Sequence, residues 1–181
     1  KTPTAWVTLS VIVISCGVYL WMRSVHEHSA SFRFHELLSW GGNFYLKTTQ
    51  GEWWRLLTSA FVHIDDLHLI LNMISLFLLG REVERVFGHL NLLILYLGSA
   101  VVAGLCSIAW YDMRLSVGAS GSIYGLFGGA ISLFLIVGEH RILAVRRRTV
   151  VIFGWILYTL FVSLFDDWVD RAGHLGGALG G

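Results

Sequence analysis

Apolar runs long enough to cross a membrane dominate this chain, and short groups of charged residues separate them. A transmembrane helix needs roughly 20 mainly apolar residues, so each charge that interrupts a run marks the end of a span. Six spans result from this division. We expect them over residues 5–22, 67–84, 90–110, 119–137, 149–165 and 173–181. The sequence therefore predicts an all-α, polytopic membrane protein.

The composition agrees with a lipid environment. Of the 181 residues, 55% are hydrophobic and 14% are charged, whereas soluble domains have about 45–50% and about 25%. A net charge of +1 argues against a nucleic-acid partner, which would need many more cations on one face. Cys16 and Cys106 both fall in apolar spans, where thiols behave as small hydrophobic groups, so we expect no disulfide.

The last span is too short to cross the membrane. Residues 173–181 rise about 1.5 Å each along a helix and cannot cover about 30 Å of hydrocarbon. We therefore expect the sixth helix to be cut off at Gly181, and residues 1–181 to form a single membrane domain within a longer chain.

Residues 23–66 form the longest connection, and their composition differs from that of the spans. Aromatic residues alternate there with charged ones, which is typical of a segment in the membrane interface. Among the aromatic residues are Phe32, Phe34, Trp40, Phe44, Tyr45, Trp53 and Trp54. We expect an interfacial first loop on the outer side.

The distribution of Lys and Arg predicts the orientation. The two sides carry seven and six of these residues, but Arg141 and Arg146 to Arg148 lie close together between the fourth and fifth spans. Short cation-rich loops stay in the cytoplasm, so we place this loop and the N-terminus there. The compact core without an organelle-targeting segment at its start favours a bacterial inner membrane.

Four polar residues lie inside the predicted spans: His68, Asn72, Ser120 and His174. Such residues are costly in lipid and usually face the bundle interior, where they mark functional sites. His68 and Asn72 are four residues apart and share a helix face. In the predicted orientation, all four lie in the outer turns of the second, fourth and sixth spans.

These residue types suit nucleophilic acyl transfer. A serine hydroxyl becomes nucleophilic when a neutral imidazole accepts its proton, which His174 can do for Ser120. The developing oxyanion needs fixed donors, and we expect these from the Ser120 N–H and the side chains of His68 and Asn72. Gly118 and Gly121 would let a peptide backbone approach closely.

Several motifs resemble the rhomboid family of intramembrane serine proteases. They are Gly118-Ala119-Ser120-Gly121, the run from His174 to Gly181, His68 to Asn72, Trp54-Arg55, and a Gly-x-x-x-Glu-x-x-x-Gly pattern at Gly80, Glu84 and Gly88. The resemblance extends over nearly the whole six-helix core in the right order. It implies a six-transmembrane-helix bundle with a long first loop.

The resemblance also implies residue roles. Ser120 would be the nucleophile and His174 the general base, with Tyr124 packed beside the His174 ring. His68, Asn72 and the backbone around Ala119 and Ser120 would bind the oxyanion or substrate together with Gly118. Family members act as serine endopeptidases on single-span membrane proteins near the outer bilayer surface. One departure is Gly173, which stands where the family commonly has Ala.

A third group that orients the histidine would complete a triad. Asp166, Asp167 and Asp170 precede His174, and Asp170 would share its face if the helix began early. A group of acids in a short outer loop is usually solvated, so we expect packing against Tyr124 to orient the ring.

Two alternatives come from other classes. A zinc protease needs His-Glu-x-x-His, but His35-Glu36 is followed by Ser39, and His63 and His68 diverge by about 140° on a helix. We expect no metal and no cofactor. A transporter or channel with a polar His, Asn and Ser path is the second alternative, although the sequence has no internal repeat. The predicted partners are transmembrane protein substrates and the lipid bilayer, and the sequence does not specify an oligomeric state.

Overall fold

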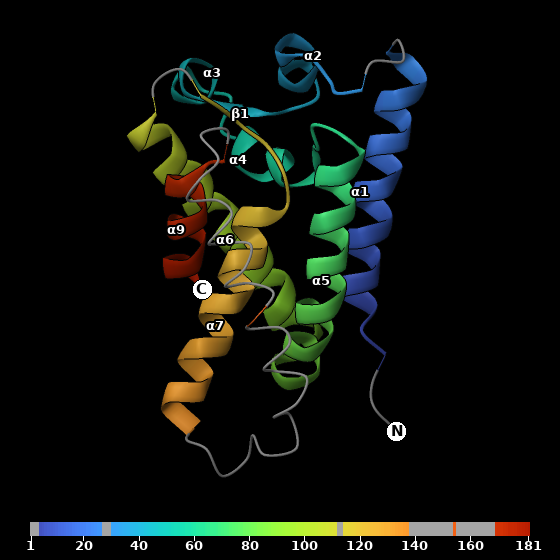
Figure 1. Cartoon of the computed structure of the whole chain (residues 1–181). Helices are drawn as coiled ribbons and strands as arrows, with labels where there is room; N and C mark the ends of the chain where they lie inside the picture. The colour runs from blue at the N-terminus through green and yellow to red at the C-terminus, as the bar shows by residue number, and fades with distance from the viewer. Residues whose placement is uncertain (1–3, 27–29, 112–113, 138–153, 155–168) are drawn as a thin grey trace.

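A computed structural model describes residues 4–26, 30–111, 114–137, 154 and 169–181 of the chain. Most of the predicted fifth span, residues 149–165, and the basic group around Arg146 lie outside the described residues. Five long or medium helices run side by side, and α5, α7 and α9 run opposite to α1 and α6 (Figure 1). They are α1 (Trp6–Val25), α5 (Asp66–Phe87), α6 (His89–Trp110), α7 (Ser120–Val137) and α9 (Arg171–Gly180).

These helices begin and end within three residues of five predicted ranges. Among the described residues, α1 and α6 are the two helices long and apolar enough to cross a membrane. The predicted helical class therefore holds, while the number of six spans stays a prediction.

Residues 23–66 contain more regular structure than a plain loop. Four short helices gather at the end of the bundle opposite the N-terminus (Figure 1). They are α2 (Phe34–Ser39), α3 (Tyr45–Thr49), α4 (Arg55–Thr58) and the 3-10 helix η1 (Ser59–Phe61). Two short strands, β1 (Asn43–Phe44) and β2 (Leu115–Ser116), pair antiparallel and tie this region to the segment before α7.

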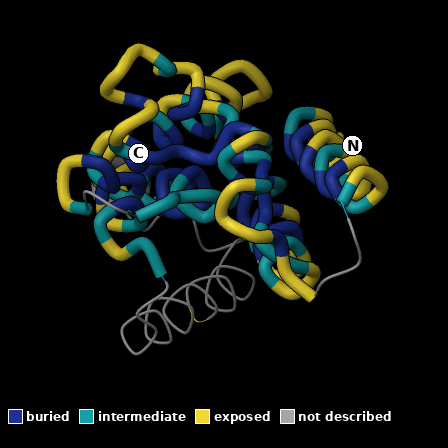
Figure 2. The backbone as a smooth tube through the Cα atoms, turned by 90° about the horizontal axis from the view of Figure 1, so that it is seen from above, coloured by how far each residue is buried: buried dark blue, intermediate teal, exposed yellow. Residues whose placement is uncertain are grey.

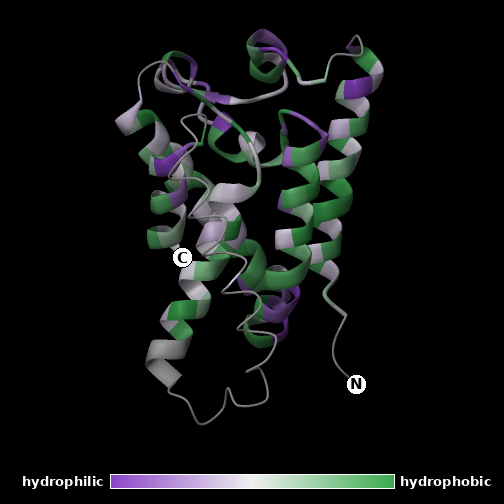
Figure 3. Cartoon of the chain, in the orientation of Figure 1, coloured by the Kyte–Doolittle hydropathy of each residue, from purple (hydrophilic) through white to green (hydrophobic). Residues whose placement is uncertain are grey.

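Each long helix packs against its neighbours through a narrow stripe of buried residues. On α1 the buried residues recur every three or four positions, which is one face of a helix. Figure 2 shows the buried positions gathered toward the centre of the bundle and the exposed positions toward its outside. In Figure 3 the hydrophobic colour runs along the long helices, and the hydrophilic colour gathers at the two ends. Such a distribution suits helices surrounded by lipid.

Glu84 joins α5 to the first turn of α1. Its buried carboxylate accepts hydrogen bonds from Val7 N (2.8 Å), Thr8 N (2.8 Å) and Thr8 Oγ1 (2.6 Å). His89 Nδ1 contacts Oε1, the oxygen that also accepts from Val7 N. The N-cap residue of α1, Ala5, has no side-chain acceptor, so Glu84 satisfies free N–H groups of this helix end. This contact explains the Glu in the Gly-x-x-x-Glu-x-x-x-Gly pattern.

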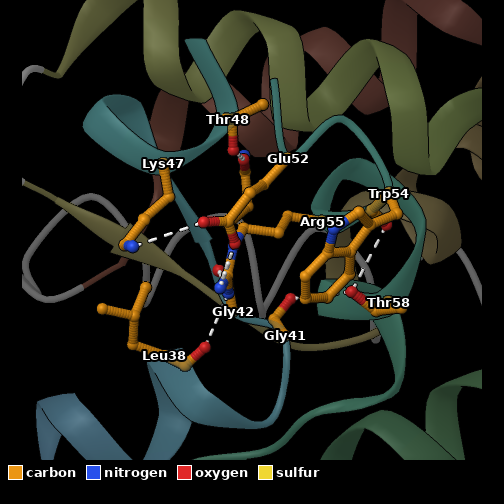
Figure 4. Close-up of polar contacts among 10 residues, drawn as sticks. Leu38, Gly41, Gly42, Lys47, Thr48, Glu52, Trp54, Arg55 and Thr58 are labelled. Carbon is orange, nitrogen blue, oxygen red and sulfur yellow. Dashed lines mark hydrogen bonds and ion pairs between the residues drawn. The ribbon is translucent and has the colours of Figure 1, made fainter. Parts of the chain in front are cut away.

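Arg55 holds the short helices together (Figure 4). Its Nη1 donates to Leu38 O (2.6 Å) and Gly42 O (3.0 Å), and its Nε donates to Glu52 Oε2 (2.7 Å). The ion pairs with Arg55 and Lys47 lower the pKa of Glu52, the hydrogen bond from Arg55 being the largest cause. One planar guanidinium thus fixes two carbonyls and a carboxylate from three segments of residues 23–66.

Candidate active site

The helices α5, α7 and α9 all begin at the end of the bundle that carries the short helices (Figure 1). Their first turns surround a cavity of about 800 Å³. The four polar residues predicted from the sequence all line this cavity: His68, Asn72, Ser120 and His174. The fold thus brings together residues that are up to 106 positions apart in the chain, from His68 to His174.

The turn before Ser120 depends on a glycine. Gly118 has φ +114°, which favours glycine, and a Cβ on it would lie 2.6 Å from His68 Cε1. Gly118 N donates to Ser59 O (2.9 Å), and β2 pairs with β1 just upstream. Ser120 then begins α7, so its N–H has no acceptor within its own helix.

Ser120 and His174 are in hydrogen-bond contact. Ser120 Oγ lies 2.8 Å from His174 Nε2, and both residues are half-buried. The Tyr124 ring packs against the His174 ring with 4.4 Å between centroids and an interplanar angle of 38°. This is the distance that a general base needs to take the serine proton.

Close packing of α7 on α9 sets this distance. A Cβ on Gly177 would collide with Gly121 O, and a Cβ on Gly128 would collide with Ala178 O. A Cβ on Gly121 would lie 2.6 Å from Ala103 Cβ on α6. The small residues therefore allow the helix backbones to touch and bring Ser120 within reach of His174.

His68 and Asn72 present donors from α5. Ile64 N donates to His68 Nδ1 (3.4 Å), so the neutral ring carries its proton on Nε2. Nε2 lies beside Gly118, where it would be 2.7 Å from an added Cβ. Asn72 Nδ2 donates one hydrogen to His68 O (2.8 Å), which leaves its second hydrogen for another acceptor. Both side chains line the cavity and keep a hydrogen that they can donate.

The N–H of Ala119 already has an acceptor within the protein. Its N–H donates to His63 Nε2 (3.4 Å) rather than into the cavity, and Ala119 is fully buried. The spacing of His63 and His68 in the sequence raised only the question of a zinc site, so the place of His63 beside Ala119 was not predicted. His63 is fully buried, and its Nδ1 lies 3.3 Å from Phe61 O. Because His63 takes the N–H of Ala119, the N–H of Ser120 is the backbone donor of this turn that stays available, and the predicted oxyanion role of this backbone stays a prediction.

Comparison with known proteins decides the family. A family model described as the Rhomboid domain matches residues 50–181, which include the whole cavity end of α5, α7 and α9. This chain belongs to the rhomboid family. Rhomboid membership makes it an integral membrane protein, in agreement with the apolar lengths of α1 and α6.

Several rhomboid proteins are similar to this chain. The rhomboid protease GluP of Bacillus subtilis (strain 168) is 33% identical over 132 residues, which are 73% of this chain and 25% of that protein. The rhomboid protease AarA of Providencia stuartii is 28% identical over 95% of this chain and 68% of its own length. Rhomboid-like protease 1 of Toxoplasma gondii is 33% identical over 80% of this chain and 50% of that protein. The chain thus spans about a quarter to two thirds of these relatives.

Proposed function

We propose that this chain is an intramembrane serine endopeptidase in which Ser120 and His174 form the catalytic dyad. The observation that carries the proposal is the 2.8 Å contact between Ser120 Oγ and His174 Nε2 at the wall of the cavity. The names of its relatives as rhomboid proteases support the reaction class.

Acylation begins at the serine hydroxyl. Ser120 Oγ bonds to the carbonyl carbon of the scissile peptide while its proton moves to His174 Nε2, and the carbonyl electron pair moves onto oxygen. The N–H of Ser120 and the side chains of His68 and Asn72 donate to that oxyanion. These donors are fixed before the substrate arrives, so the charge is stabilised without reorganisation of the site.

The leaving group and water complete the reaction. The peptide C–N bond breaks as the amine takes the proton from His174 Nε2–H, and an ester remains on Ser120. A water molecule then gives a proton to His174 and attacks the ester. Ser120 Oγ regains this proton as the C–O bond breaks and the carboxylic acid leaves. Polar residues such as Ser31, Ser59 and Asp65 also line the cavity, which suits the entry of water to the ester.

The substrates are membrane proteins with a single span, cleaved near the outer bilayer surface. The starts of α5, α7 and α9 lie at the end of the bundle opposite the N-terminus (Figure 1). With a cytoplasmic N-terminus, this end faces outward, and residues 23–66 lie in the outer interface. The bundle has six spans, and a bacterial inner membrane is its location.

The substitution Ser120→Ala tests the function. We expect it to lower cleavage of a membrane-embedded reporter by about 10³-fold or more because no nucleophile remains. Thermal unfolding in detergent should stay within about 1 kcal/mol of the unsubstituted protein, since Ser120 is half-buried. Reporter cleavage at the original rate in purified Ser120→Ala would contradict the proposed function.

A further inference from the structure

Two buried polar atoms beside the dyad have no hydrogen-bond partner among the described residues. They are His174 Nδ1 and Asp170 Oδ2. Both residues are on the first turn of α9, four positions apart, which places their side chains on one helix face. Buried polar atoms without a partner are uncommon in proteins, and each calls for a reason. The two atoms have complementary hydrogen-bonding capacity.

The chemistry of Ser120 decides the state of the ring. Because Nε2 accepts the Ser120 hydroxyl, the neutral ring carries its proton on Nδ1, which is then a donor. Asp170 Oδ2 is an acceptor. When Nε2 takes the serine proton, the ring becomes positively charged, and its Nδ1–H becomes a stronger donor.

The other carboxylate oxygen already fixes Asp170 in place. Asp170 is the N-cap of α9, and its Oδ1 accepts from Gly173 N (2.8 Å). Arg114 Nη1 donates to Val169 O (2.6 Å), which anchors the chain just before this cap. Oδ1 therefore caps the helix, and Oδ2 can accept a hydrogen bond from another group.

Gly173 makes room for this carboxylate. A Cβ at position 173 would lie 2.6 Å from Asp170 Oδ2 and 2.8 Å from Asp170 Cγ. The carboxylate thus occupies the space that an alanine side chain would take at this position. The departure from the common Ala, noted in the sequence, is coupled to the inward position of Asp170.

We propose that Asp170 is a positioning residue for His174: its Oδ2 accepts the His174 Nδ1–H through one bridging water as the imidazolium forms. The inference rests on the proposed function and deepens it, since it adds an acid to the Ser120 and His174 dyad. The Tyr124 ring holds one face of the imidazole, and Asp170 fixes its rotation about that stack. Ser120 contacts the opposite side of the ring, with its Oγ 2.8 Å from Nε2.

Two substitutions separate this role from helix capping. Asp170→Ser keeps an N-cap acceptor for Gly173 N but removes the second oxygen. Asp170→Asn offers one oxygen and one NH₂ group, so either Gly173 N–H or His174 Nδ1–H faces a donor whichever way the amide turns. We expect kcat for reporter cleavage to fall about 10-fold in Asp170→Ser and about 100-fold in Asp170→Asn, with KM unchanged. A residue that only caps the helix would not move kcat alone.

The controls separate the possible failures. Asp66→Asn removes a carboxylate whose side chain is 72% exposed at the same end of the molecule, and it should leave kcat unchanged. All rates are normalised to the folded fraction from thermal unfolding. Unchanged kcat in both Asp170 variants, or a loss explained entirely by unfolding, overturns the inference while an inactive Ser120→Ala leaves the proposed function standing. Cleavage by Ser120→Ala would instead overturn the proposed function.

Discussion

Two buried polar clusters lie near opposite ends of α5, and they differ in how fully their hydrogen bonds are made. At one end, both oxygens of Glu84 are occupied by donors from Val7, Thr8 and His89. At the other end, in the cluster of His68, Asn72, Ser120 and His174, His174 Nδ1 has no hydrogen-bond partner among the described residues, and Asn72 Nδ2 keeps one hydrogen beyond its bond to His68 O.

This difference suggests that the Glu84 cluster serves stability and that the Ser120 cluster serves the reaction. A complete cluster lowers the energy of the folded state because no buried donor or acceptor lacks a partner. An incomplete cluster keeps hydrogen-bond donors and acceptors available. These can bind groups that exist only during the reaction, such as an oxyanion or an imidazolium. We therefore expect substitutions in the Glu84 cluster to change stability, and substitutions in the Ser120 cluster to change kcat.

The largest effect is expected for Glu84→Ala. The substitution leaves the N–H groups of Val7 and Thr8 buried without an acceptor, and we expect the free energy of unfolding to fall by about 3 kcal/mol. Denaturant or thermal unfolding in detergent measures this loss. The folded fraction should cleave the reporter with kcat within about threefold of the original. A kcat that drops as far as in Ser120→Ala would break the comparison.

Asn72→Ala should give the opposite result. Asn72 is buried, and its amide donates to His68 O on its own helix, so its loss removes few contacts that stabilise the fold. Removal of one oxyanion donor lowers kcat by about 100-fold. Steady-state cleavage measures this change, with unfolding in the same detergent as its control. If the substitution destabilises the protein and leaves kcat intact, Asn72 contributes to stability and not to the reaction.

Thr8→Val gives the smallest effect and sharpens the first result. It removes one hydroxyl from the Glu84 cluster but keeps the side-chain volume and the Thr8 N–H contact. We expect a loss of about 1 kcal/mol in unfolding free energy and no change in kcat. The same unfolding assay compares this variant with Glu84→Ala. A larger loss in Thr8→Val than in Glu84→Ala would show that the hydroxyl, and not the helix-end N–H groups, dominates the cluster.

Local sequence predicted the helices because run length and periodicity are local properties. The ranges over α1, α5, α6, α7 and α9 follow from apolar runs and their charged ends. The polar residues of the cavity followed from the same division, since a polar group inside an apolar run is visible without a structure.

The remaining contacts could not be predicted because their partners are backbone groups far along the chain. His63 accepts from the N–H of Ala119, which is 56 positions away and carries no signature in its side chain. Arg55 donates to the backbone carbonyls of Leu38 and Gly42. Such partners have no side-chain signature, so the arrangement of the short helices in residues 23–66 could not be predicted either. The signal that the sequence offered for His63 was its position five residues before His68. That spacing indicated only that the two histidines do not form a zinc site.

The most direct test of the central claim is covalent labelling of Ser120. A fluorophosphonate probe reacts with a serine only when a base activates it, so we expect labelling in the unsubstituted protein, mapped by peptide analysis to Ser120. The label should be lost in His174→Ala and retained in folded Glu84→Ala. Labelling of Ser120 that survives His174→Ala at the original rate, or that maps to another residue, would contradict a dyad of Ser120 and His174.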